Sequence, residues 1–594
     1  MKKRVLCLLL SVVMLVACLT GCSKKNATSA IEDVNEEASE STLTLAMYLL
    51  CEKDISEEQQ EKISEAVNKI TKSKFKTQLV LKFYTADEYY TELEKAFAAR
   101  AEAKAAGLIN TTPVTTEEST EEETVMNEYG FTELAYPEIA DYQVDIFYVG
   151  GYEKFDKYMD MSMLQNLNDE LSINSKKLNN YIATPYLKYM KEVNNGVYAI
   201  PANTVIGEYT YMLLNKQALA DYGLNSDTGL KYFSYINDSD LANFLKNIKD
   251  HSSDKYLPLY TNLTNTELAS TGVTVTEDDK GNKFNSSVNF WGIGADGQLS
   301  NDFSVLASNY TVNAKYGSSS SYMPKMEGFL NTVFSTQFDC IMDYRRNGYF
   351  AEDMSVDGKD AAVMYLKGNI NDIEKYTDDY EVVVIKNPTL DTKTLYENMF
   401  AVSSYTTSVS RSMKILTYLN TNADFRNILL YGIEDENYEL VPSDYVDENG
   451  VAIEVVRRLN EDYLMDTNKL GNTLIGYTLE GQDPTFKDYI MKQNRDAVAS
   501  VTLGFELNYD GYFVDAEKLK ALREVSLVVK EKLDTCTPET YTSVRLEINQ
   551  LIDQKLINDL SSKYSTADKT DPVGIACVYD KWAKSKGVYT SPEQ

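Results

Sequence analysis

The chain has 594 residues, of which 58 are Lys or Arg and 90 are Asp or Glu, so its formal net charge at pH 7 is −32. The length allows several domains with ordinary hydrophobic cores. The charge repels nucleic acid, since no basic stripe follows the first few residues, and the single histidine, His251, excludes a histidine-rich metal site and any mechanism that needs two imidazoles.

The first 21 residues have the pattern of an export signal. Lys2, Lys3 and Arg4 precede an apolar run at 5–19 that is too short to be kept as a membrane-spanning helix. Leu19-Thr20-Gly21-Cys22 then resembles the bacterial lipobox, which implies cleavage before Cys22 and a lipid on its thiol. We therefore expect a lipid-anchored, extracellular protein on the outer face of the cytoplasmic membrane. A plain secretory signal that happens to contain a cysteine is the alternative.

Strand and helix patterns alternate after a flexible tether at 22–41, which is rich in Ser, Asn, Glu and Ala. The expected elements are a strand at 42–48, a helix after a capping box at 56–59, a strand at 78–84, a helix after a capping box at 85–88, and a strand at 144–149 followed by Gly150-Gly151. This order predicts a parallel α/β lobe. A Thr- and Glu-rich run at 111–124 predicts an acidic, disordered insertion over about 108–130.

The rest of the chain is less regular. We expect short strands at 198–201, 209–214, 361–365 and 381–385, a helix at 215–222, mixed helix and strand signals at 326–338, and mainly helix over 516–584. Residues 252–325 are rich in Ser, Thr, Asn and Gly and give no clear pattern. Glu448-Asn449-Gly450 predicts a hairpin turn within 438–456, which explains the acidic run at 444–450 more simply than a calcium site does.

Other site motifs are weak. Gly292 to Gly297 matches GxGxxG, but no convincing helix start follows it, and an exported protein meets no nicotinamide pool. Cys51, Cys340, Cys536 and Cys577 show neither metal-ligand nor disulfide-framework spacing, so one or two disulfides and buried free thiols both stay open. We expect no cofactor and no metal.

Several segments resemble the extracellular solute-binding proteins of ATP-driven importers, family 1. These segments are 145–151, 198–201, 214–224, 361–368, 429–434 and 438–440, and their order spans most of residues 42–594. The chain departs from the family pattern in the insertion at 100–140 and in Asn437, where histidine is common. It also departs at Lys367-Gly368-Asn369, which lacks the aromatic residue expected after the glycine.

The resemblance implies an α/β, two-lobed periplasmic-binding-protein-like fold of the class II type, with hinge crossovers and a helical C-terminal region. Lobe 1 would comprise 42–203 and 402–475, and lobe 2 would comprise 204–401 and 476–594. The crossovers would lie near 203–207, 400–405 and 476–481. Ligand would bind in the cleft between the lobes, which would close over it by rotation.

Loops at the carboxyl ends of strands build the ligand site in such folds. Tyrosine suits carbohydrate because its ring offers a stacking face and its hydroxyl a hydrogen bond, although most of the 44 tyrosines are expected in the core or on the surface. The candidate ligand-binding residues are Tyr48, Tyr148, Gly150, Tyr152, Asn203, Tyr209, Asn369, Ser403, Tyr405 and Tyr477.

The expected function is capture of a small solute, an oligosaccharide, and its delivery to the permease subunits of an ABC transporter. We expect a monomer without catalytic residues. Two alternatives from other classes stay open: a surface lipoprotein that hydrolyses glycans or proteins, and a solute-sensing or adhesive lipoprotein without a transporter.

Overall fold

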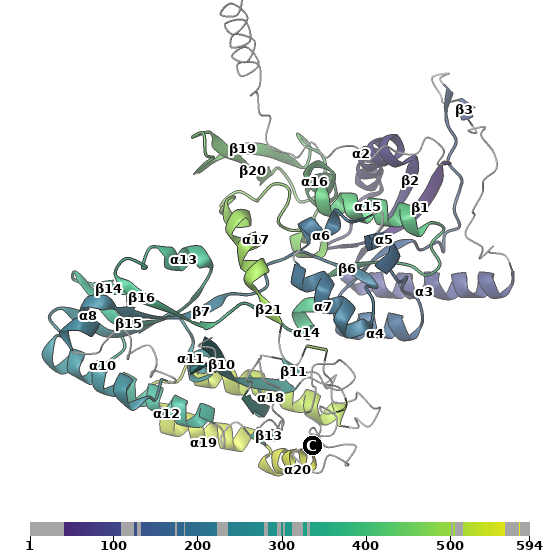
Figure 1. Ribbon diagram of the computed structural model, residues 1–594. Helices are drawn as coiled ribbons and strands as arrows, with labels where there is room; N and C mark the ends of the chain where they lie inside the picture. The colour runs from purple at the N-terminus through teal and green to yellow at the C-terminus, as the bar shows by residue number, and fades with distance from the viewer. Residues whose placement is uncertain are drawn as a thin grey trace, which may run out of the picture. The chain divides into compact units, whose positions relative to one another are not determined.

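The computed structural model describes residues 41–107, 124–126, 132–172, 175–182, 184–222, 236–271, 273–277, 283–293, 299–300, 303–311, 325–328, 333–499, 503–504, 515–564 and 581 (Figure 1). The expected signal, Cys22 and nearly all of the tether lie outside these residues. So does most of the acidic insertion, of which only β3 (Thr124–Met126) is described, paired antiparallel with β4 (Thr132–Leu134) just after it.

The first sheet has five strands in the order β2-β1-β5-β18-β6. They are β1 (Leu43–Cys51), β2 (Thr77–Thr85), β5 (Ile146–Val149), β6 (Ala199–Pro201) and β18 (Met399–Val402). β1 runs parallel to β2 and β5, whereas β18 is antiparallel to β5 and β6. The predicted parallel lobe is therefore present, with one antiparallel strand that the chain adds on a second pass.

The local predictions for this sheet hold in position and fail in two details. Ser56 caps helix α2 (Glu57–Phe75) by accepting a bond from the Gln59 N–H, but the Gln59 side chain donates to Asn437 at 2.9 Å instead of completing a capping box. Helix α3 (Ala86–Ala105) follows Thr85 without a side-chain cap bond. Both boxes marked helix starts correctly because their position, more than their full bonding, reflects the helix boundary.

Helices cover the first sheet and share one hydrophobic core with it. They are α4 (Tyr152–Asp160), α5 (Asn168–Ser172), α6 (Leu178–Tyr181), α7 (Thr184–Asn194), α14 (Thr392–Tyr396), α15 (Val409–Thr421) and α16 (Ala423–Tyr431), with the 3-10 turn η2 (Thr467–Lys469). The predicted hairpin is confirmed as β19 (Tyr438–Val446) and β20 (Ala452–Arg458). Gly450 has φ +77°, and the Asp447 carboxylate accepts the Asn449 and Val451 N–H groups at 2.9 Å, so the acidic run serves the turn.

The second sheet contains β8 (Tyr256–Thr261), β14 (Ser355–Val356), β15 (Lys359–Gly368), β7 (Tyr209–Asn215) and β16 (Tyr380–Lys386). β7 is antiparallel to β15 and β16, and β8 is parallel to β15. One face packs on a large core and the other on a smaller one, which explains why β7 is buried along its whole length. The strands predicted at 209–214, 361–365 and 381–385 are confirmed.

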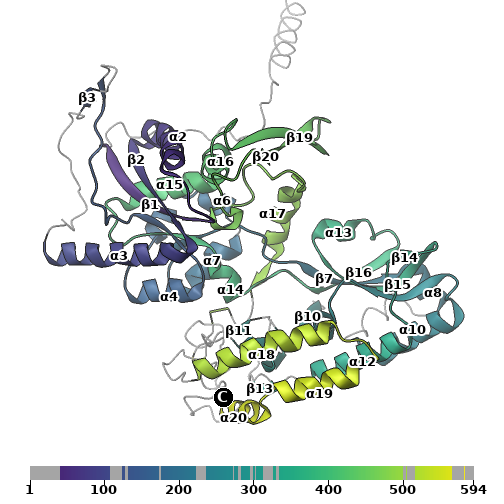
Figure 2. The same ribbon diagram turned by 180° about the vertical axis from the view of Figure 1, so that it is seen from behind.

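Helices from distant parts of the chain form the core under the second sheet. They are α8 (Lys216–Asp221), α10 (Ser239–His251), α11 (Asn265–Ala269), α12 (Val333–Arg346), α18 (Ala516–Asp534), α19 (Tyr541–Leu551) and α20 (Gln554–Tyr564), while α13 (Ile370–Glu374) lies at the smaller core. Figure 2 shows α19 beside α12, and Tyr541 packs on Phe338 there at 5.8 Å between ring centroids. The helical tail is thus confirmed as far as Tyr564.

A third sheet, not predicted from the sequence, occupies the region that gave no clear pattern. Its strands are β9 (Val273–Glu277), β10 (Lys283–Ile293), β11 (Leu299–Ser300), β12 (Leu306–Thr311) and β13 (Lys325–Gly328), all antiparallel. Gly292, the first glycine of the GxGxxG match, pairs with both β11 and β12 inside β10. The match therefore begins within an antiparallel ladder, whereas the dinucleotide fingerprint needs a turn from a strand into a helix.

The strand positions bear on the expected crossovers, which stay predictions. β18 belongs to the first sheet, and Leu395 and Tyr396 lie in the first core, so the chain has reached that core before Met399. Leu479, Ala497 and Leu503 also pack with the first core, so the chain is still part of it at Leu503. Residues 202–208, the first expected crossover, connect β6 of the first sheet to β7 of the second.

Three further observations concern thiols and membranes. Cys51, Cys340 and Cys536 are free thiols, and Cys577 lies outside the described residues. Burial raises the pKa of the Cys51 thiol to about 12, which keeps it protonated and unreactive at neutral pH. Within the part of the chain that the structure describes, no helix combines the length and the apolar character needed to cross a bilayer.

Candidate functional site

The register of the two main sheets defines two edges. The first edge is the one at which β1, β2, β5 and β6 end and β18 begins, since Met399 pairs with both Val149 and Pro201. The second edge is the one at which β15 and β16 end and β7 begins, since Tyr209 pairs with Gly368 and Thr210 with Lys386. Residues 202–208 connect the first edge to the second, and residues 387–398 connect the second back to the first.

Gly150 and Gly151 follow β5 at the first edge. A Cβ on Gly150 would lie 2.6 Å from the Tyr148 hydroxyl oxygen, and Gly151 has φ +85°. The Gly150 N–H donates to the Tyr90 hydroxyl at 3.2 Å, and the Gly151 N–H donates to the Tyr396 carbonyl at 2.8 Å. Glycine is needed at Gly150 because the Tyr148 hydroxyl approaches closely, and it is favoured at Gly151 because of the positive φ.

Tyr148 and Tyr152 lie at the same edge in different surroundings. Tyr148 is 3% exposed and donates to Asn398 Oδ1 at 2.7 Å, and burial raises the pKa of its hydroxyl well above the usual range. Tyr152 is half-buried, with its ring 5.1 Å from the Tyr396 ring between centroids. Tyr152 therefore exposes part of its ring, whereas Tyr148 is buried and its hydroxyl is bonded to Asn398.

Asn398 is a residue of the first edge that the sequence prediction missed. Its carbonyl accepts the Ala202 N–H at 2.8 Å while its side chain accepts the Tyr148 hydroxyl. It thereby joins the start of 202–208 to the end of 387–398. Its position directly before β18 indicates a site residue only once β18 is known to begin at this edge.

Asn203 is 2% exposed and anchors the first crossover. Its Nδ2 donates to the Tyr181 carbonyl at 2.7 Å and to Asn472 Oδ1 at 3.1 Å, and its carbonyl accepts the Thr473 N–H at 3.1 Å and hydroxyl at 2.9 Å. These bonds give Asn203 a structural role at the hinge.

Four predicted site residues lie away from both edges. β1 continues to Cys51, so Tyr48 is inside the strand, where it is 1% exposed and stacks on Tyr84 at 5.9 Å. Because β18 is antiparallel to β5, Ser403 and Tyr405 lie at the opposite end of the first sheet, where the Ser403 N–H donates to the Asp145 carbonyl at 2.9 Å.

Tyr477 lies beside helix α16. Its N–H donates to Asn427 Oδ1 at 3.1 Å and its carbonyl accepts the Tyr431 hydroxyl at 3.0 Å. Tyr477 thus also lies away from both edges, and a ligand-binding role for these four residues stays a prediction. For Tyr48, Ser403 and Tyr405 the placement follows from strand length or direction, which the sequence pattern does not report.

The second edge contains Tyr209, which pairs with Gly368, and Asn369 directly follows that glycine. Tyr209 stacks on Tyr211 at 5.2 Å between centroids, and its hydroxyl donates to Asp496 at 3.4 Å. Burial and the Asp496 charge raise the pKa of that hydroxyl. Asn369 is half-buried at the start of α13, where its N–H donates to Asp372 Oδ2 at 2.7 Å.

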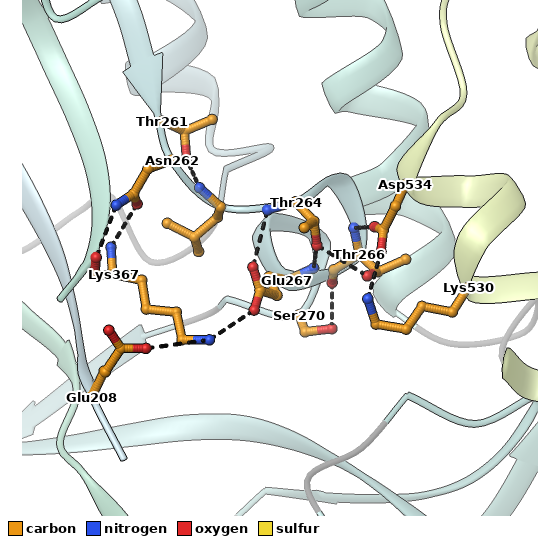
Figure 3. Close-up of polar contacts among 11 residues, drawn as sticks. Glu208, Thr261, Asn262, Thr264, Thr266, Glu267, Ser270, Lys367, Lys530 and Asp534 are labelled. Atoms are coloured by element: carbon orange, nitrogen blue, oxygen red, sulfur yellow. Dashed lines mark hydrogen bonds and ion pairs between the residues drawn. The ribbon is translucent and has the colours of Figure 1, made fainter. Parts of the chain in front are cut away.

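A charged cluster that was not predicted adjoins these residues. Lys367 lies between two carboxylates, with Nζ 3.0 Å from Glu267 Oε1 and 3.6 Å from Glu208 Oε2 (Figure 3). Asn262 holds the Lys367 backbone by reciprocal 2.8 Å bonds to its N–H and carbonyl. Burial alone would lower the pKa of Lys367, but the two carboxylates outweigh it and raise that pKa.

The two edges offer amide, ammonium, carboxylate and phenolic groups, which are suited to a hydroxyl-rich ligand. In the described part of the chain, no three His, Cys, Asp or Glu side chains are grouped so that they could hold a metal ion.

No protein-family model and no curated protein matches the chain. Solved structures do. The N-glycan transport solute binding protein (NgtS) from Streptococcus pneumoniae is 16% identical, with a TM-score of 0.45, and the match covers 92% of this chain and 100% of that chain. An extracellular solute-binding protein from Bifidobacterium longum subsp. infantis is 15% identical, with a TM-score of 0.35 and coverages of 88% and 99%. Extracellular solute-binding protein family 1 from Alicyclobacillus acidocaldarius is 11% identical, with a TM-score of 0.35 and coverages of 88% and 99%.

This chain is similar to extracellular solute-binding proteins. That is the family that the sequence motifs predict. The α/β assignment follows from the chain's own strand order and cores.

Proposed function

We propose that the chain is an extracellular substrate-binding lipoprotein that captures an oligosaccharide between two α/β lobes and delivers it to the permease subunits of an ABC transporter. One observation carries the proposal: residues 202–208 and 387–398 both run between the first edge and the second edge. A rotation about this pair of connections would close the loops of both edges on a bound molecule.

The chemistry of the edges supports a polyhydroxylated ligand. Lys367 and Glu208 are each 41% exposed at the second edge, and Tyr152 offers part of its ring at the first. Ammonium and carboxylate groups bond sugar hydroxyls as donor and acceptor, and a half-buried phenol ring can pack on the C–H face of a pyranose. The proposal assigns these groups binding alone.

The proposed lobes follow the sheets. Lobe 1 would hold residues 43–201 and about 388–503, and lobe 2 would hold residues 209–386 and 515–564. Compared with the division expected from the sequence, about 388–401 and 476–503 would belong to lobe 1 instead of lobe 2, because their strand and core partners belong to the first sheet.

Membrane attachment through Cys22 is part of the proposal. In a bacterial host grown with labelled palmitate, the full chain should incorporate label and stay with the membrane fraction. A Cys22→Ser variant should lose the label. Label in that variant, or secretion of the unaltered chain into the medium, would contradict the lipid anchor.

The main experiment is a thermal-shift screen of the soluble domain from residue 41 onward. A ligand that binds the folded state raises the melting temperature by linkage, so neutral and acidic oligosaccharides, peptides and amino acids are compared at one concentration. A saturable shift with one glycan class supports the proposal, and a shift with peptides alone rejects the sugar assignment. Release of reducing ends from the bound glycan would instead favour a hydrolase, and light scattering of the same sample tests the expected monomer.

A further inference from the structure

Helix α17 (Phe486–Asp496) places a buried amide between the first crossover and helix α13. Gln493 is 0% exposed. Its Nε2 donates to the Gly207 carbonyl at 2.5 Å, and its Oε1 accepts the Ile370 N–H at 3.3 Å. One side chain therefore uses both of its polar ends to bond two segments that are far apart in the sequence.

The next residue of the same helix, Asn494, also bonds the crossover. Asn494 is 1% exposed, with Oδ1 accepting the Ile206 N–H at 2.9 Å and Nδ2 donating to the Thr204 carbonyl at 2.6 Å. Gly207 has φ +92°, a conformation that favours glycine and that aims its carbonyl at Gln493. Backbone groups of 204–207 that would otherwise need water are thus satisfied by α17.

The partners of α17 come from both sheets. On either side of the helix, Leu479 bridges to Val456 of β20, and Ala497 lies in the first core. Ile370, by contrast, packs against the smaller core of the second sheet, and Asn369 directly precedes it. The Gln493–Ile370 bond therefore joins a helix held by the first core to a residue of the second sheet's edge.

We propose that Gln493 is a positioning residue of the ligand site. It fixes the position of Asn369 and the start of α13 relative to the first crossover, and so determines where the groups of the second edge lie when a ligand binds. The inference rests on the proposed function for the site itself. An amide is required because the two partners are a carbonyl and an N–H, so the side chain must donate and accept at once.

The test is Gln493→Glu, which keeps the shape of the side chain. A carboxylate accepts the Ile370 N–H but cannot donate to the Gly207 carbonyl, whereas the protonated acid can do both. At pH 7.5 we expect hydrogen exchange to speed up together in 202–208 and 369–374, without ligand present. At pH 5, where a buried glutamic acid is largely neutral, exchange corrected for pH should return toward that of the unaltered protein.

The matched control is Gln482→Glu, the same change at an exposed glutamine of the preceding loop. Unaltered protein and control are measured at each pH to subtract the titration of other charged groups on the same elements: Glu208, Asp372, Glu374, Lys487, Asp488, Lys492, Arg495 and Asp496. Gln493→Ala serves as a second variant if Gln493→Glu fails to fold. Unchanged exchange in 369–374 in these variants would overturn the inference.

Binding is measured with the glycan that gives the largest thermal shift with unaltered protein. Gln493→Glu should weaken its affinity by about tenfold or more at pH 7.5 and regain it at pH 5, well below the melting temperature. A lower melting temperature with unchanged affinity would mean that Gln493 only stabilises the fold. If unaltered protein binds no glycan, the proposed function fails and the site role with it, whereas the exchange measurement still decides the coupling of the two segments.

Discussion

Asp145 and Thr406 lie 261 positions apart in the sequence and are joined by a 2.7 Å hydrogen bond from the threonine hydroxyl to the carboxylate. The same carboxylate accepts the Thr407 N–H at 3.0 Å, the Ala46 N–H at 2.8 Å and Gln143 Nε2 at 2.6 Å. Asp145 is 0% exposed. The aspartate of the family-like motif, directly before β5, therefore joins β1 and the loop after β18 by hydrogen bonds. It lies at the end of the sheet opposite Gly150.

The first prediction concerns this carboxylate. Asp145→Asn should lower the free energy of unfolding by about 2–4 kcal/mol, because an amide turns an NH₂ group toward buried donors. Urea unfolding followed by circular dichroism measures the change. Asp141→Asn, the same substitution at an exposed position, is the control and should stay within about 0.5 kcal/mol. Equal effects at both positions would contradict the fastening role.

A second prediction concerns acid stability. Asp515 is 2% exposed and accepts Lys518 Nζ and the Tyr564 hydroxyl at 2.7 Å each, together with Lys563. Burial alone would raise its pKa, but these bonds outweigh burial and lower it. A folded pKa below the unfolded value contributes stability that is present above about pH 4 and is lost as the pH falls toward the folded pKa.

Asp515→Asn should therefore lower the free energy of unfolding by about 1.5–3 kcal/mol at pH 7, and the difference from unaltered protein should shrink below pH 4. Denaturant titrations from pH 3 to 7 measure it. Glu517→Gln, an exposed acid two residues on, is the control. A difference independent of pH would argue against the charge as the cause.

Alkaline stability gives a third prediction. Burial, followed by the charge of Arg426, lowers the pKa of Lys487 to about 8. The unfolded chain, with lysine near 10.5, then binds more protons between pH 8 and 10.5, so this group makes stability rise with pH over that interval. Lys487→Met should remove about 1–2 kcal/mol of the rise between pH 7 and 9.5, whereas exposed Lys492→Met should leave it unchanged. Parallel pH curves for unaltered protein and Lys487→Met would show that the pKa is not lowered.

The fourth prediction tests which ends of the two sheets bind the ligand. Lys367→Met should weaken binding of the glycan found in the thermal screen by about tenfold, because an exposed ammonium at the second edge loses its bonds to ligand hydroxyls. The melting temperature should change little, since exposed ion pairs contribute only about 0–1 kcal/mol. Tyr405→Phe, at the far end of the first sheet, should bind normally. Weakened binding by Tyr405→Phe with normal binding by Lys367→Met would reverse the assignment of the site.

Much of the fold could be read from local pattern. The strands at 42–48, 78–84 and 144–149, the helix starts after Ser56 and Thr85, and the Asn-Gly hairpin all occur where alternation, capping and turn chemistry place them. These signals depend on neighbours within a few residues. Strands β9 to β13 gave no such signal, because Ser, Thr, Asn and Gly in their sequence are as typical of loops as of strands.

The candidate site was predicted less well, for a different reason. Tyr148, Gly150, Tyr152, Asn203, Tyr209 and Asn369 lie at the two edges, but most of their polar atoms bond the protein itself. Ser403 and Tyr405 were misplaced because a strand that returns antiparallel carries its end to the opposite side of the sheet. Asn398 and Gln493 belong to no motif, and Lys367 lies in the segment 361–368 without being singled out as a site residue, so only their partners mark these three residues.

The sequence by itself determined the acidic charge, the shortage of imidazole, the export signal pattern and the alternation of strands and helices, since each is a property of composition or of short segments. Only the tertiary structure decided which strand ends share an edge, that β18 joins the first sheet, and that α17 bonds a crossover and α13 through one glutamine. Those relations join residues hundreds of positions apart, and local pattern carries no information about strand direction or long-range pairing.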